Sequence, residues 1–311
     1  TSPGQLMSVY ISNPNTTTID PAGQPRSIAV KLSPDACQVV ANQSGEPMIT
    51  VQDISNYLEA FAPAVLAEEW DNVGLLVGNP DQPVERLMTC LTITPESAQE
   101  AIDRNAEMIV THHPLPFRPL KRLTTTDTAS RLLLQLIEAK VAIHSPHTAF
   151  DSAAAGINQQ LAEGLGLKSI KPLVPSPGDS QGLGSGRWGK LPEASSLQSI
   201  AQQLKIFLSI DGLQAVGNAD QPVTDVAVAC GSAGQFLEPA IQQGCDLLIT
   251  GETSFHTCLE AAASQVALLL PGHYASERFA VEQLATTLAT QFGELDIWSS
   301  ESESDPLRWW N

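Results

Sequence analysis

Two adjacent histidines, His112 and His113, follow the apolar run Met108–Thr111 and stand directly before Pro114. If that run is a buried strand, successive side chains point to opposite sides of it. The two imidazoles can then serve two centres, such as two metal ions side by side. Taken alone, a histidine pair at a strand end fits metal binding and an ordinary structural role equally well.

Two histidines are each followed four residues later by a carboxylate, His147 by Asp151 and His273 by Glu277. Four residues make about one helical turn, so both side chains of a pair can lie on one helix face. Each carboxylate also has a simpler explanation. Asp151 could cap a helix over residues 152–165, and Glu277 could be a favourable charge in the first turn of a helix.

Taken together, three histidines and two carboxylates would suit two divalent metal ions. Imidazole plus carboxylate ligation favours Zn²⁺, Fe²⁺ or Mn²⁺ over Ca²⁺. A carboxylate would bridge two ions about 3.5–4 Å apart, and a metal-bound water would be the nucleophile. This chemistry suits hydrolysis of phosphoesters or of amide-like bonds, and it does not choose between them.

The second half of the chain repeats features of the first. The segments Val77–Val84 and Val216–Val223 match at seven of eight positions, and at the same offset Met108–Thr111 falls on Leu247–Thr250. Strands alternate with helices in both halves, which predicts an α/β protein built from two repeated lobes related by a pseudo-two-fold. Ligand sites in such sheets lie beyond the carboxyl ends of strands, so we expect the metal site between the lobes.

Glu252 and His256 occupy the place in the second half that corresponds to the histidine pair of the first. They could support the metal ligands, contact a substrate, or belong to an ordinary surface loop. The segment 184–189 contains a literal G-x-G-x-x-G, but a loop precedes it. It is therefore interpreted as a glycine-rich turn and not as a dinucleotide-binding motif.

Composition limits the class of protein. Acidic residues outnumber basic ones by 34 to 16, and the net charge of −18 disfavours nucleic-acid binding. No apolar run reaches the roughly 18 residues of a membrane span, and no leader-like segment opens the chain. The five cysteines form no C-x-x-C motif, which suits reduced thiols and predicts a cytoplasmic location.

The predicted organisation has five parts. Residues 1–47 are rich in turn-forming residues and are expected to be a disordered or loosely attached extension. The first lobe is expected at 48–172, a linker at 173–190, the second lobe at 191–298 and an acidic tail at 299–311.

Five segments together resemble one protein family: Glu69–Gly78, Thr111–Leu115, His147–Asp151, Gly251–His256 and Gly272–Glu277. The chain resembles the Nif-three-like dinuclear metal-centre proteins, which are often labelled GTP cyclohydrolase I type 2 homologues, over about residues 48–298. The resemblance implies two α/β lobes, a ring-like homohexamer and no domain inserted between the lobes. It also implies that Glu277 bridges two metals and that His147, the candidate catalytic residue, lines the same cavity. The implied metal ligands are His112, His113, Asp151, His273 and Glu277.

The expected function is therefore that of a metal-dependent hydrolase acting on a small phosphoester or nucleotide-type substrate, with GTP ring opening less favoured. The alternative is a non-catalytic metal-binding protein that regulates or binds a partner. An exchangeable metal with an open coordination position and turnover would favour the enzyme. Closed coordination without turnover would favour the binding protein.

Overall fold

The computed structural model describes residues 48–176 and 183–308 of the chain. The predicted extension at 1–47 lies outside these residues, as do 177–182 and 309–311. Within the described part, none of the helices combines the length and the apolar character that crossing a membrane requires.

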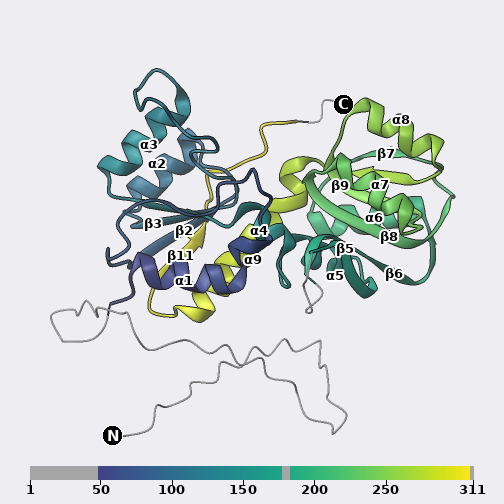
Figure 1. Ribbon diagram of the computed structural model, residues 1–311, viewed down its shortest axis with the longest axis horizontal. Helices are drawn as coiled ribbons and strands as arrows, with labels where there is room; N and C mark the ends of the chain where they lie inside the picture. Colours follow the sequence, from purple (N-terminus) through teal and green to yellow (C-terminus); the bar gives the residue numbers. More distant parts are fainter. Residues whose placement is uncertain (1–47, 177–182, 309–311) are drawn as a thin grey trace, which may run out of the picture. The chain divides into compact units, whose positions relative to one another are not determined.

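The first sheet has five strands in the order β1-β4-β3-β2-β11. Figure 1 labels β2, β3 and β11 of this sheet. Strands β4, β3, β2 and β11 are parallel neighbours, and β1 runs antiparallel to β4 at the edge. Three helices with polar N-caps belong to this part of the chain, and Thr50, Thr94 and Asp127 provide the caps. The elements are α1 (Val51–Phe61), the 3₁₀ turn η1 (Ala64–Leu66), β1 (Gly74–Val77), β2 (Arg86–Cys90), α2 (Pro95–Asp103), β3 (Met108–Thr111), α3 (Thr128–Glu138), β4 (Ala142–Ser145) and β11 (Asp296–Ser299).

Alternating side chains of the first sheet enter two different cores, as the period of a strand requires. In β3, Met108 and Val110 pack in a core shared with Leu58 of α1 and Leu284 of α9 (His273–Gln291). Ile109 packs on the other face, in a core shared with residues of α2 and α3. The helices therefore cover both faces of the sheet, and the histidines that follow β3 start from a rigid position.

The second sheet has six strands in the order β5-β6-β8-β9-β10-β7. Strands β8, β9 and β10 are parallel, and the remaining pairings are antiparallel. The elements are α4 (His147–Ser152), α5 (Ile157–Gly164), β5 (Lys168–Pro175), β6 (Gly184–Ser196), α6 (Leu197–Leu208), β7 (Gln214–Val216), β8 (Pro222–Ser232), η2 (Gly234–Phe236), α7 (Leu237–Gln242), β9 (Leu247–Glu252), α8 (Phe255–Ala263) and β10 (Ala267–Leu270).

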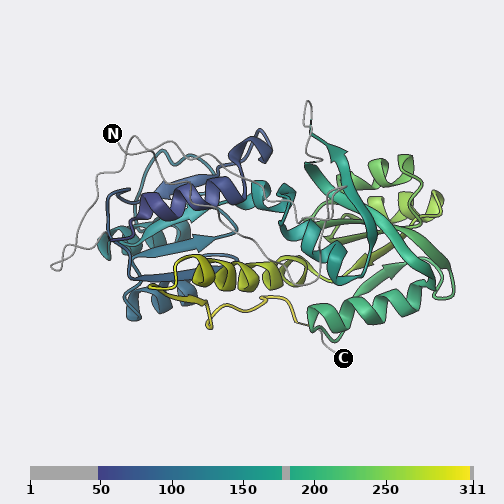
Figure 2. The same cartoon turned by 90° about the horizontal axis from the view of Figure 1, so that it is seen from below.

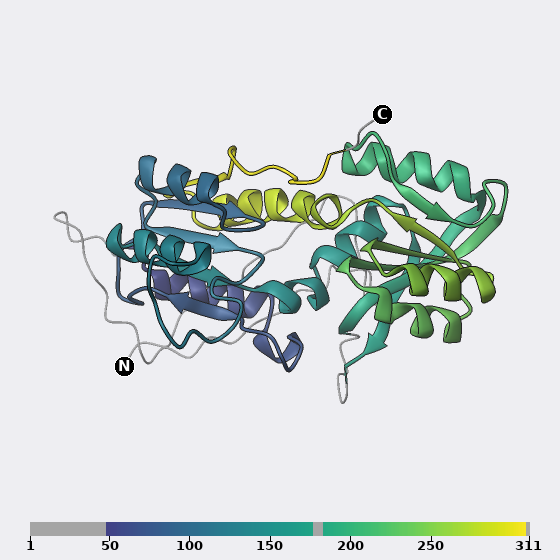
Figure 3. The same cartoon turned by 90° about the horizontal axis from the view of Figure 1, so that it is seen from above.

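The predicted α/β class with two lobes is confirmed. The two sheets also share a strand order, because β1-β4-β3-β2 in one corresponds to β7-β10-β9-β8 in the other, each with an antiparallel first strand. This correspondence agrees with the internal repeat, which stays a prediction. Helix α9 contacts strands of both sheets, and Figures 2 and 3 show it running from one to the other.

The structure differs from the predicted boundaries in three places. The expected linker at 173–190 is largely a pair of antiparallel strands, in which Val174 lies opposite Ser185, and the glycine-rich segment 184–189 is part of β6. The second lobe was expected to extend to residue 298, but β11 returns to the first sheet beside β2. A single helix was expected at 152–165; instead α4 ends at Ser152, and Gly156 precedes α5.

The predicted acidic tail is held beside α2 and the segment after β2 as far as Glu303. The Glu100 carboxylate accepts hydrogen bonds from the backbone N–H groups of Glu301 and Ser302 and from the Ser300 hydroxyl. Glu303 is buried, and its carboxylate accepts hydrogen bonds from the backbone N–H groups of Leu91 and Thr92. Hydrogen bonds to Glu100 of α2 and to the backbone of Leu91 and Thr92, just after β2, therefore hold this tail in place.

Candidate metal centre

The histidine pair continues the hydrogen-bonded ladder beyond the end of β3. The backbone N–H of His112 donates to Cys90 O at 3.0 Å, and that of His113 donates to Leu91 O at 2.8 Å. The backbone is therefore held in register next to β2, and the two rings diverge, with centroids 5.1 Å apart at 52°. The His112 side chain is almost fully buried, while that of His113 is partly open.

Two helices bring the other predicted residues to the same place. Both His147 and Asp151 lie in α4, which follows β4 directly, while α9 starts at His273 and carries Glu277 in its first turns. The i,i+4 pairing inferred from the sequence is therefore realised in both helices. Because Asp151 lies inside α4, the alternative that it caps a following helix does not hold; Gly156 stands at the N-cap of α5.

Six of these side chains form three overlapping groups that could hold a metal ion. In each group the ligand atoms lie within 4.8 Å of one another. Glu277 belongs to two of the groups, and so do His112 and His113. The groups are His112 with His113 and His147, His113 with His273 and Glu277, and His112 with Asp151 and Glu277.

The two oxygens of Glu277 face different histidines. Oε1 lies 3.8 Å from His112 Nε2, and Oε2 lies 3.2 Å from both His113 Nε2 and His273 Nε2. Asp151 Oδ1 is 3.6 Å from His112 Nε2. Two donors bound tetrahedrally to one ion at 2.0–2.1 Å stand about 3.4 Å apart. The observed spacing therefore fits shared ligation.

Unpartnered polar atoms at this site support the same fit. Neither Nε2 nor Nδ1 of His112 has a hydrogen-bond partner, although the residue is only 2 % exposed, and Glu277 Oε2 is likewise buried without one. Buried polar atoms without partners are uncommon because each loses its hydration. A divalent ion would satisfy the donor atoms that point inward, so the residues present fit a metal centre.

Electrostatics keep the central carboxylate charged. Burial opposes ionisation of Glu277, but His112, His113 and His273 outweigh it and hold the pKa of this carboxyl well below its usual range. The nearby Glu277 carboxylate, with Oε2 3.2 Å from His273 Nε2, raises the pKa of His273 to about 9. Burial raises the pKa of Asp151. Protons and metal ions therefore compete for the same donor atoms, as expected for a binding site that metal completes.

Three ligand-type histidines are oriented through their second ring nitrogen. His273 Nδ1 lies 3.0 Å from Glu252 Oε1, and His113 Nδ1 lies 2.6 Å from the Thr92 hydroxyl. His147 Nδ1 lies 2.7 Å from Asp71 Oδ1. Such contacts leave Nε2 directed toward the centre, and they fix ring orientation in metal sites.

Only one of the two predicted supporting residues, Glu252 and His256, has a contact with a candidate metal ligand among the described contacts. Glu252 contacts His273 directly. His256 lies on α8 and makes a ring contact with Phe255 at 6.1 Å. Its predicted role at the centre stays a prediction.

Several residues at the centre were not singled out from the sequence. The Cys230 thiol donates to Asp151 Oδ1 at 3.1 Å, and Gly231 approaches Glu277 so closely that a Cβ there would lie 2.3 Å from Oε1. Asp71 belongs to the segment Glu69–Gly78 that carried the family resemblance, which was the available signal. Thr92 and Cys230 lie at or just beyond strand ends, the place where ligand sites are expected in open α/β sheets.

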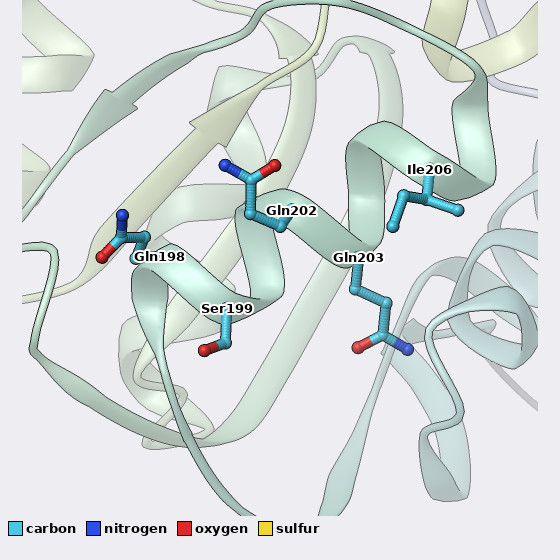
Figure 4. A pocket seen from close by; sticks show the side chains of 5 residues that line it. All are labelled: Gln198, Ser199, Gln202, Gln203 and Ile206. Carbon is cyan, nitrogen blue, oxygen red and sulfur yellow. The ribbon is translucent and has the colours of Figure 1, made fainter.

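A pocket elsewhere on the surface offers no comparable chemistry. It lies along α6 and is lined by uncharged side chains without titratable groups (Figure 4). The lining residues are Gln198, Ser199, Gln202, Gln203 and Ile206.

The part of the chain that carries the candidate metal centre is similar to known proteins. Residues 49–306 match the family model described as Duf34/NIF3 (NGG1p interacting factor 3). The GTP cyclohydrolase 1 type 2 homolog of Clostridium acetobutylicum is 32% identical over 229 residues, which cover 74% of this chain and 85% of that protein. NIF3-like protein 1 of Drosophila melanogaster is 34% identical over 252 residues, which cover 80% and 86%, respectively.

Solved structures share the fold. The crystal structure of the Staphylococcus aureus hypothetical protein SA1388 superposes with a TM-score of 0.77 at 26% identity, covering 85% of this chain and 100% of that chain. Reduced HcgD from Methanocaldococcus jannaschii superposes with a TM-score of 0.71 at 26% identity, covering 81% and 98%.

Proposed function

This chain belongs to the Duf34/NIF3 family, as its motifs predicted, and we propose that it is a metal-dependent hydrolase of small phosphoester or nucleotide-type substrates. Two divalent ions, Zn²⁺, Fe²⁺ or Mn²⁺, would be held at the centre. The observation that carries the proposal is the position of Glu277, whose two oxygens face two different sets of donors. The proposed ligands are His112, His113, Asp151, His273 and Glu277.

Each ion would have its own donors and share one carboxylate. His112 lies near Glu277 Oε1 and forms a group with Asp151, while His113 and His273 lie near Oε2. When bound, divalent ions at such a site supply Lewis acidity to a substrate oxygen and lower the pKa of water. Glu252 and Thr92 would orient the His273 and His113 rings.

His147 is proposed to act as the general base that accepts a proton from water. Burial opposes ionisation of Asp71, but hydrogen bonds from His147 and Thr148 outweigh it and lower the pKa of Asp71 to about 2. An ionised Asp71 can only accept, so it keeps the proton on His147 Nδ1. The Nε2 of the neutral ring then carries the lone pair and can accept a proton from water beside His112 and His113.

The proposal also covers the cellular location, the oligomeric state and the substrate. Free cysteines at Cys90, Cys230, Cys245 and Cys258 support a reducing, cytoplasmic location. The homohexamer is proposed on the family resemblance alone. Several relatives carry the name GTP cyclohydrolase 1 type 2 homolog, so GTP belongs in the substrate panel.

The test uses two matched variants of α9, Glu277→Gln and Glu282→Gln. Glu282 lies on the same helix with a side chain that is 57% exposed, and it pairs only loosely with Arg278. After reconstitution with Zn²⁺, Mn²⁺ or Fe²⁺, metal content is measured by elemental analysis, and turnover is measured on phosphomonoesters, nucleotides and GTP. We expect Glu277→Gln to lose metal and turnover and Glu282→Gln to keep both.

Two results would count against the proposal. Full metal content in Glu277→Gln would reduce Glu277 to a helix-terminus charge worth about 0.3–1 kcal/mol. A metal-loaded wild-type protein without turnover on any member of the panel would favour the non-catalytic, partner-binding alternative.

A further inference from the structure

Two large aromatic side chains stand exposed beside the candidate metal centre. Trp70 is 61% exposed and Phe117 is 46% exposed. Their ring centroids lie 5.9 Å apart, although the residues come from different loops. Isolated exposed apolar residues need no explanation, but a contiguous aromatic pair next to polar groups is a common feature of binding sites.

The backbone that carries these two rings is fixed. The Asp71 carboxylate, next to Trp70, accepts hydrogen bonds from the His147 ring and from the Thr148 backbone N–H at 3.1 Å. The Asn72 side-chain amide donates to Pro116 O at 2.9 Å, which ties the two loops together. The rings are therefore presented to solvent on a preorganised frame, which reduces the entropy lost when a ligand stacks on them.

His147 joins the aromatic pair to the metal-binding groups. Its ring lies 6.0 Å from that of Trp70 and 6.1 Å from that of Phe117. On its other side it lies 5.2 Å from the His112 ring and 5.6 Å from the His113 ring. Only the His147 imidazole would then separate a bound ring stacked on the aromatic pair from the proposed metal ligands His112 and His113.

Positive charge follows directly in the chain. Arg118, Lys121 and Arg122 are all exposed and come just after Phe117, in a protein whose net charge is −18. A local run of cations in an acidic protein favours an anionic ligand. Arginine also binds phosphate through paired N–H groups.

We propose that Trp70 and Phe117 form a binding subsite for a planar aromatic ring that carries an anionic group, with a nucleobase of a nucleotide as the fitting class. Its place in catalysis rests on the proposed function, because the ring would hold a phosphoester toward the histidines. The binding itself does not depend on turnover.

The test compares two ligands that differ only in the ring. Binding of adenosine 5′-phosphate and of ribose 5-phosphate to the metal-loaded full-length protein is measured by calorimetry. Stacking of one base on an aromatic side chain should make the nucleotide bind roughly tenfold more tightly. Trp70→Ala and Phe117→Ala should each remove most of that difference and leave ribose 5-phosphate binding unchanged, whereas Trp70→Phe should restore part of it.

Ile206→Ala is the control, because Ile206 is 80% exposed and lines the pocket of Figure 4. It should bind both ligands like the wild type; a loss of the ring preference there would place the ring on α6 and overturn the proposal. Equal binding of the two ligands by the wild type would also overturn it. So would a change of oligomeric mass in Trp70→Ala by light scattering without loss of ring preference, since the pair would then be a contact between copies.

Failure of this subsite and failure of the hydrolase proposal give different results. Ring preference that depends on Trp70 in a protein without turnover supports the subsite and contradicts the hydrolase. Turnover with no effect of Trp70→Ala on ring preference supports the hydrolase and contradicts the subsite.

Discussion

Gly231→Ala should remove metal from the candidate centre, although Gly231 is not itself a ligand. The residue lies near the end of β8 with φ +66°, and an added Cβ would lie 2.3 Å from Glu277 Oε1 and 3.4 Å from His273 Nε2. To restore ordinary contact, Oε1 would have to retreat by about 1 Å. Metal–ligand distances tolerate only about 0.2 Å, so Oε1 should be lost as a ligand.

Neither side of this contact can easily yield. The backbone N–H of Gly231 donates to the Ser276 hydroxyl at 3.0 Å, and its carbonyl accepts from the Thr250 hydroxyl at 3.2 Å. Glu277 is only 3 % exposed and cannot swing into solvent. Changes to groups that merely support ligands cost about 10–100-fold in metal affinity. Displacing a ligand oxygen should cost at least the upper value.

Gly244→Ala separates this clash from backbone strain. Gly244 has φ +73°, close to that of Gly231, and an added Cβ there meets nothing within 4 Å. Both alanines should cost about 1–2 kcal/mol of stability for the left-handed conformation. Only Gly231→Ala should also lower metal affinity.

The assay is a Zn²⁺ titration against a chromophoric chelator, with elemental analysis for stoichiometry and urea unfolding of the metal-free proteins. If Gly231→Ala binds metal with wild-type affinity and stoichiometry while unfolding like Gly244→Ala, the Glu277 oxygen that faces His112 is not a ligand. That result would refute the assignment of Glu277 as a bridge.

Three further predictions address stability. Because the proposed ligands come from both lobes, chelation should lower the melting temperature, by an amount equivalent to about 2.7 kcal/mol if free metal had been one hundred times Kd; equal melting of the holo and chelated proteins would contradict this. Burial lowers the pKa of His144 to about 4. Below about pH 6.5 the unfolded chain therefore binds more protons than the folded chain, and the free energy of unfolding should decrease as the pH is lowered. The metal-free wild type should therefore lose about 1 kcal/mol between pH 7.5 and 5.5 that His144→Gln does not lose, as measured in urea. Glu303→Ala should cost about 1–3 kcal/mol in the same assay because it leaves the Leu91 and Thr92 amides without their acceptor, whereas Glu301→Ala, with a side chain that is 79% exposed, should cost far less.

Local patterns predicted the helices and strands that position the candidate centre. The i,i+4 spacing of His147 with Asp151 and of His273 with Glu277 follows from helical geometry alone. The divergence of His112 and His113 follows from strand geometry. Capping residues such as Thr50 and Thr94 stand directly before α1 and α2, so the starts of these helices are encoded locally in the sequence.

Contacts between distant segments could not be predicted in the same way. The hydrogen bond of Thr92 to His113 and that of Cys230 to Asp151 depend on which strand ends become neighbours. The return of β11 to the first sheet was also missed, because an apolar strand carries no mark of the sheet it joins. The break between α4 and α5 was also missed; it includes a tight position at Gly156 where only glycine fits, since a Cβ there would lie 1.9 Å from Phe150 O.

Helix α9 explains why the lobes and the centre depend on each other. Its buried residues include the charged Glu277 and Arg278 as well as Val281 and Leu284. Phe279 packs against the cores of both sheets. The carboxylate of Glu277 is therefore positioned by packing that both lobes contribute. A shift of α9 against the first sheet would change the distances from Oε1 to His112 and from Oε2 to His113, whereas His273 would move with the helix. The integrity of the centre therefore depends on how α9 packs against the first sheet.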